Sequence, residues 1–89
     1  MSQHQEVEVI PVIYERIRDY FNLGLVQGFE VWPAAMEEGW FLVFMTKNVP
    51  GNFVLINRRT QQPRVFKTLD AAVKALEGLG FRVQGFRGL

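Results

Sequence analysis

One short polar turn contains two glutamines and is flanked by four basic side chains. These six residues are the ones in the chain best suited to bind an anionic partner. The segment 57–67 has the sequence NRRTQQPRVFK. Arginine forks match phosphate oxygens, and glutamine amides can hydrogen-bond base edges in a DNA groove. We therefore predict a basic β-hairpin turn that contacts DNA through Arg58, Arg59, Gln61, Gln62, Arg64 and Lys67. The alternative is a turn that is polar only because it faces water.

The charge of the chain is distributed unevenly, which favours the same hypothesis. The net charge is only +1, but residues 1–45 contain two basic and seven acidic side chains, a balance of −5. Residues 46–89 contain eight basic and two acidic side chains, a balance of +6. A basic half suggests an anionic partner. The alternative is that the two halves neutralise each other within one fold.

Residues that could support catalysis or metal binding are scarce. The chain has no cysteine, one histidine (His4, in the polar N-terminal segment) and one serine, Ser2. Glu37 and Glu38 are adjacent, so in an extended segment their carboxylates point to opposite sides instead of converging on one substrate. None of the common nucleophile, metal or phosphate-loop motifs occurs. We predict that the chain is not an enzyme and that it has no cofactor and no metal.

The length and hydropathy indicate one small domain outside the membrane. Eighty-nine residues suffice for a single core, so we predict one domain, 1–89, with residues 1–7 as a disordered polar tail. The longest apolar run, 40–45, is far shorter than a membrane span, and the N-terminal residues do not form a signal peptide. We expect a cytoplasmic protein without a membrane partner.

The apolar spacing of the first half predicts one helix and two strands. Ile10, Ile13, Ile17 and others recur at helical spacing, so a helix is expected over 10–22, with Pro11 in its first turn. A weaker strand follows from about Gly28. The segment 40–47 predicts a strand that is apolar on both faces and therefore covered on both.

The second half predicts two more strands, a helix and a weak final strand. Pro50 and Gly51 suit a tight turn between strands at 40–47 and 53–57, and a short strand is expected at 64–67. Thr68 and Gly80 match the caps of a helix over 69–79, and 81–86 could form a last strand. The sequence thus predicts an α+β domain. Its antiparallel sheet of three to five strands carries two helices, in the order α-β-β-β-β-α-β.

The segment 40–79 resembles a known DNA-binding module. Strand, polar turn and strand are followed by FKTLDAAVKAL, in which Phe66, Thr68, Ala71 and Ala72 match the phrase that opens the helix. This is similar to the three-stranded-sheet-plus-helix arm-type domain of phage and conjugative-element recombinases. The resemblance implies a small accessory or regulatory DNA-binding protein of a mobile element. The order is also similar to a double-stranded-RNA-binding domain, but residues 68–72 lack the lysine cluster of that family.

A protein-interaction module is the competing hypothesis from a different functional class. The chain contains many aromatic side chains for its length, among them Trp32, Trp40, Phe41, Phe44, Phe81 and Phe86. Two amphipathic helices do not obviously cover both faces of the strand at 40–45, and excess apolar surface on a small domain indicates a partner protein or a homodimer. The alternative is a tight aromatic core.

Overall fold

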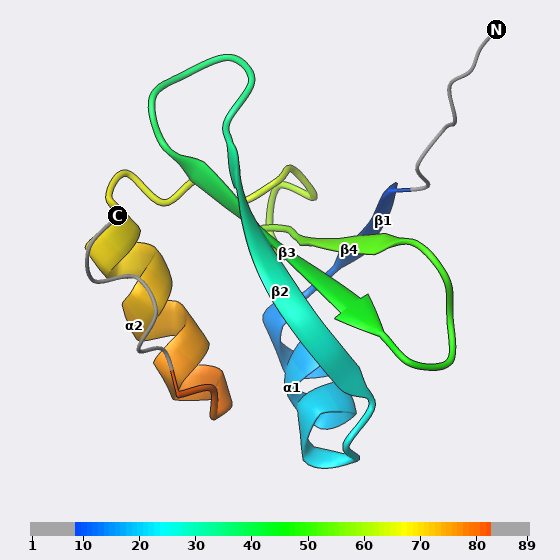
Figure 1. Ribbon diagram of the computed structural model, residues 1–89. Coiled ribbons are helices and arrows are strands. Elements are labelled where there is room, and N and C mark those ends of the chain that lie inside the picture. Colours follow the sequence, from blue (N-terminus) through cyan, green and yellow to red (C-terminus); the bar gives the residue numbers. More distant parts are fainter. Residues whose placement is uncertain (1–8, 83–89) are drawn as a thin grey trace, which may run out of the picture.

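The computed structural model describes residues 9–82 and shows two helices and a four-stranded sheet (Figure 1). The elements in chain order are β1 (Val9–Val12), α1 (Tyr14–Asn22), β2 (Val26–Pro33), β3 (Trp40–Thr46), β4 (Asn52–Leu55) and α2 (Leu69–Leu79). The predicted α+β class with two helices is therefore confirmed. The predicted final strand falls mostly on residues outside the described range, and Phe81 is not in a strand.

The sheet is mixed, so the prediction of a fully antiparallel sheet was wrong. Its strand order is β1-β4-β3-β2, with β2, β3 and β4 forming an antiparallel meander. β1 lies parallel to β4, with Pro11 beside Val54. A parallel pair requires a long connection, and here α1, β2 and β3 all lie between the two strands in the sequence.

The start of the chain's first helix was also predicted wrongly. The expected helix over 10–22 is in fact β1 followed by α1, which begins at Tyr14. Val9, Ile10 and Val12 are β-branched and favour extended backbone. Pro11 is tolerated because β1 is an edge strand, where one side of the backbone needs no ladder partner.

The second helix has the caps that the sequence predicted. The Ala71 N–H donates to the Thr68 hydroxyl oxygen at 3.1 Å, and Gly80 ends α2 with a positive φ of 119°. Gly51 also has a positive φ, as its turn requires. The expected strand at 64–67 was wrong, because only isolated bridges form, from Pro63 to Ile56 and from Phe66 to Trp40. β1 occupies the outer edge of β4 that a further strand would need.

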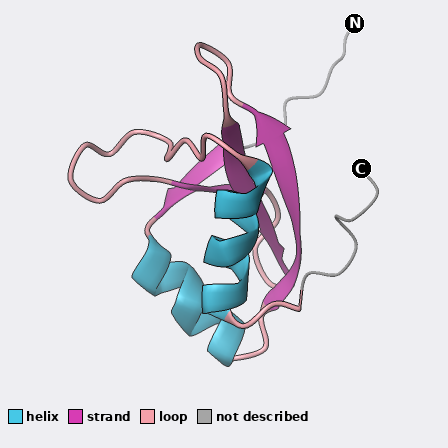
Figure 2. Cartoon of the chain, turned by 90° about the vertical axis from the view of Figure 1, so that its left-hand side faces the viewer, coloured by secondary structure: helices cyan, strands magenta, loops and turns pink. Residues whose placement is uncertain are grey.

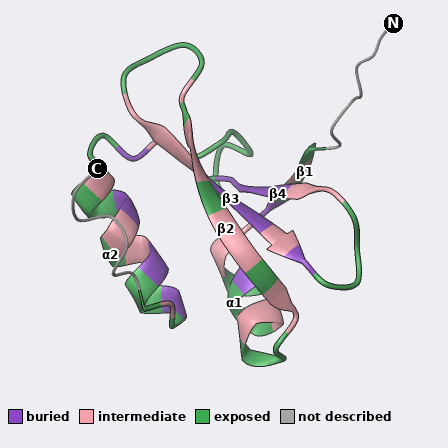
Figure 3. Cartoon of the chain, viewed as in Figure 1, coloured by how far each residue is buried: buried purple, intermediate pink, exposed green. Residues whose placement is uncertain are grey.

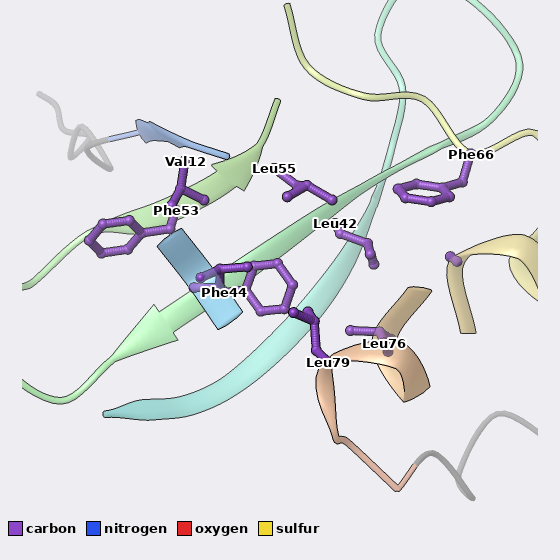
Figure 4. Close-up of a cluster of buried hydrophobic side chains, with 10 residues drawn as sticks. Val12, Leu42, Phe44, Phe53, Leu55, Phe66, Leu76 and Leu79 are labelled. Atoms are coloured by element: carbon purple, nitrogen blue, oxygen red, sulfur yellow. The ribbon is translucent and has the colours of Figure 1, made fainter. Parts of the chain in front are cut away.

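Both helices pack on the same face of the sheet, and the core lies between them and the strands (Figure 2). Leu42 and Phe44 project from β3 toward Leu76 and Leu79 of α2 (Figure 4). Ile17 of α1 is fully buried in the same cluster. Because side chains alternate along a strand, the neighbours of Leu42 and Phe44 must lie on the opposite face, over which neither helix packs.

Candidate functional site

The loop 57–62 that carries most of the predicted site is a compact turn closed by Asn57. The Asn57 N–H donates to the Gln62 carbonyl at 2.8 Å, and the Gln61 N–H donates to the Asn57 carbonyl at 2.7 Å. The Asn57 side-chain oxygen accepts from the N–H groups of Arg59 and Thr60 at 2.9 and 3.3 Å. These bonds hold an exposed loop in one shape and explain why Gln61 adopts a φ of +62°.

All six predicted site residues are exposed, but their side chains have different partners. Arg58 forms an ion pair with Glu15 of α1 at 3.6 Å, and Lys67 pairs with Glu37 at 3.4 Å. The guanidinium carbon of Arg64 lies 4.7 Å from the centre of the Phe66 ring. These three cations are therefore drawn toward three separate parts of the fold.

The remaining three predicted residues stay on the loop itself. The Gln61 amide donates to the Arg58 carbonyl at 2.9 Å, which uses part of the hydrogen-bonding capacity proposed for base recognition. Arg59 has no ion pair within residues 9–82. There, Gln62 forms hydrogen bonds only through its own N–H and carbonyl groups, to Thr60 and Asn57. A hollow of about 720 Å³ is lined by Asn57, Arg58, Arg59 and Thr60.

Both ion pairs among the described residues join the acidic half of the sequence to the basic half. Glu15 and Glu37 come from the first half, and Arg58 and Lys67 come from the second. The side chains are more than half exposed, so each pair adds little stability, roughly 0–1 kcal/mol. They nevertheless show that part of the charge asymmetry is neutralised within the fold, as the alternative explanation of that asymmetry proposed.

A second hollow, here called the apolar hollow, lies on the face of the sheet opposite the helices. It has a volume of about 290 Å³. Val54 and Ile56 are buried, whereas Val9 is 54% exposed and Phe41 is half-buried. Most of β4 is buried (Figure 3). The apolar hollow is lined by Val9, Pro11, Trp32, Phe41, Val54, Ile56, Gln61 and Pro63.

The register of the strands explains why these side chains meet. Trp32 lies beside Phe41 across the β2–β3 pair, and Pro11 lies beside Val54 across the β1–β4 pair. Pro63 is bridged to Ile56, which brings the end of the 57–62 loop to the same place. Four strands and one loop thus contribute to one surface that is almost wholly apolar.

The two edges of the sheet are poorly suited to pairing with another strand. β1 contains Pro11, which has no N–H to donate. β2 has a register irregularity between Val26 and Gly28, and its exposed Glu30 accepts a hydrogen bond from the Trp32 indole at 2.8 Å. Bulges, proline and charged residues are the usual protections of sheet edges. Association through the face is therefore favoured over strand addition.

The sequence predicted a second apolar face on the strand at 40–45, but it did not indicate most of the residues that line the apolar hollow. The strand at 40–45 was expected to be covered on both faces, and Phe41 indeed points away from the helices. Val9, Pro11 and Pro63 were not identified, because Val9 and Pro11 reach the surface only through the parallel β1–β4 pairing. No local pattern in the sequence indicates that pairing.

Residues 9–82 contain no cluster of three side chains suited to hold a metal ion, and no helix among them is long and apolar enough to cross a membrane. Comparison of the chain with protein-family models, with curated proteins and with solved structures found no match. The resemblance to the arm-type module therefore stays a prediction, and the geometry of the two hollows is the basis for proposing a function.

Proposed function

We propose that this chain is a protein-interaction module that binds its partner through the apolar hollow. The observation that carries the proposal is the position of Trp32 and Phe41, which line an open hollow on the sheet face that the helices do not cover. The proposed activity is binding, without catalysis. The DNA-binding hypothesis becomes the second candidate, since the described contacts of its residues diverge.

The composition of the hollow supports this function in physical terms. Protein interfaces are enriched in aromatic residues, methionine and arginine, and their centres are poor in charge. The apolar hollow contains one tryptophan and one phenylalanine and no charged residue. A partner side chain packed on such rings can contribute about 2 kcal/mol or more to binding.

A charge placed in the hollow tests this proposal. We expect Val9→Asp to abolish binding of the partner, because an unpaired carboxylate would be desolvated in the complex. Leu23→Asp is the matched control, since Leu23 is 70% exposed and lies at the end of α1, outside the hollow. The measurement is the set of proteins, the chain itself included, retained by each immobilised variant. Equal retention by the two variants would refute the proposed surface.

Nucleic-acid binding is kept as a second candidate because of Arg59. Its side chain is exposed, lines the larger hollow beside Arg58, and has no ion pair within the described part of the chain. Two adjacent arginines on a rigid loop can position a phosphate group. The exposed glutamines Gln61 and Gln62 would then lie beside the backbone contact.

The double variant Arg58→Ala/Arg59→Ala tests this second candidate. If the loop binds duplex DNA, affinity should fall and the slope of log affinity against log salt should decrease by about 2, one for each lost phosphate contact. Lys74→Ala, on the exposed face of α2, is the control for a general change of charge. An unchanged affinity and slope would exclude the loop as a DNA contact.

A further inference from the structure

The hairpin tip, residues 34–39 between β2 and β3, presents an apolar side chain to solvent. Met36 is 92% exposed, more than any other large apolar residue within 9–82. The tip extends beyond the body of the sheet (Figure 1). A single exposed apolar residue is ordinary on a protein surface. Here the same chain also has an open apolar hollow, which gives the residue a complementary site.

One backbone hydrogen bond and one exposed ion pair restrict the hairpin tip. The Ala34 N–H donates to the Gly39 carbonyl at 2.9 Å, which closes the loop. Lys67 pairs with Glu37 at 3.4 Å and ties the tip to the strand-like segment before α2. A preorganised loop loses less conformational freedom on binding than a mobile one.

The charges beside the two surfaces are complementary. Glu38 lies on the tip two residues after Met36, and Arg59 belongs to the 57–62 loop whose Gln61 lines the apolar hollow. Neither Glu38 nor Arg59 has an ion pair within residues 9–82. One acid on the tip and one base on the loop that borders the hollow thus have no ion pair in the part of the chain that the structure describes.

From these observations we infer that the partner in the apolar hollow is the hairpin tip of a second copy of this chain. Met36 enters the hollow and packs on Trp32 and Phe41, and Glu38 reaches Arg59 of the other copy. The inference rests on the proposed interaction function and names its partner. It also assigns a role to the acidic and basic halves, which neutralise each other between copies as well as within one.

The position of the tip favours a closed pair over an open chain of molecules. Trp32 lies just before the tip and Phe41 just after it, so the inserting element and the receiving hollow are at the same end of the hairpin. The tip of each copy can therefore bind the apolar hollow of the other copy, with the two copies related by a two-fold axis. One side chain and its rim bury less than the roughly 800 Å² per partner of a standard interface, so the pair should be weak and concentration-dependent.

The test is sedimentation of the full chain over a wide range of protein concentration. We expect the mass to rise from that of a monomer to that of a dimer. Met36→Lys should weaken the dimer at least about tenfold, as the loss of a central anchor does. Leu23→Lys, the same change at another exposed apolar residue, should leave the dimer unchanged.

Two charge reversals test whether the contact joins different copies. Glu38→Arg and Arg59→Glu should each weaken self-association, because each homodimer then brings like charges together twice. An equimolar mixture of the two variants should recover it, since the mixed pair has two attractive contacts. Recovery in the mixture requires residues from different molecules.

Four results would overturn the inference. A monomer at every concentration would exclude the second copy, while the Val9→Asp comparison would still decide whether the hollow binds another protein. A mass that grows beyond two copies would exclude the closed pair. Equal effects of Met36→Lys and Leu23→Lys, or no recovery in the mixture, would exclude the hairpin tip as the contact.

Discussion

Replacing Phe44 with alanine is expected to destabilise the fold by about 3–5 kcal/mol. The side chain has no exposed surface and packs in the cluster that joins the sheet to α2. Its ring also stacks on Phe81, with 6.1 Å between ring centres. Alanine would leave a cavity beneath both elements. Because domains of this size have a total stability near the lower end of roughly 5–15 kcal/mol, a large fraction of the variant should be unfolded.

Phe41→Ala is the matched control, since it removes the same side chain from the same strand on the opposite face. Phe41 is only half-buried and lines the apolar hollow, so its loss should reduce stability by only about 1–2 kcal/mol. It should instead weaken self-association. Urea unfolding followed by circular dichroism measures the stability, and sedimentation measures the association. Equal losses of stability in Phe41→Ala and Phe44→Ala would contradict the prediction, because they would mean that both faces of β3 are equally buried.

The part of the fold that could be predicted from sequence is the part whose signals are local. Helix α2 has the predicted bounds, because its sequence signals all lie in or next to the helix. These signals are the N-cap at Thr68, the glycine at position 80 and the apolar stripe between them. β3 was evident from its unbroken apolar run. Local signals failed at β1, where Ile10 and Ile13 fit helical spacing although the backbone of β1 pairs with β4.

The candidate surfaces depended on long-range pairing and were therefore predicted only in part. The exposure of Arg58 and Arg59 followed from their place in a polar turn. Their partners did not, because Glu15 lies far away in the sequence and meets Arg58 only after α1 packs under the sheet. The apolar hollow likewise forms only when β1 aligns with β4 and Pro63 with Ile56.

Gly39→Ala is expected to cost about 2–4 kcal/mol, from backbone strain and overpacking together. Gly39 has a φ of +138°, a backbone conformation that residues other than glycine rarely adopt. An added Cβ would lie 2.5 Å from a Val65 methyl carbon and 2.9 Å from the Phe66 carbonyl oxygen. That oxygen accepts the Trp40 N–H at 2.9 Å, so relieving the clash would break the bridge that joins the segment before α2 to β3.

Gly24→Ala separates the two causes, because Gly24 also has a positive φ, +77°, but no atom within 4 Å of an added Cβ. It should cost only about 1–2 kcal/mol, from backbone strain alone. Thermal unfolding of both variants measures the difference, and equal losses would mean that the close packing at Gly39 has no energetic role. Gly39 also closes the hairpin tip that carries Met36. If that tip binds a second copy, Gly39→Ala should weaken self-association even where the protein remains folded, whereas Gly24→Ala should leave the association unchanged.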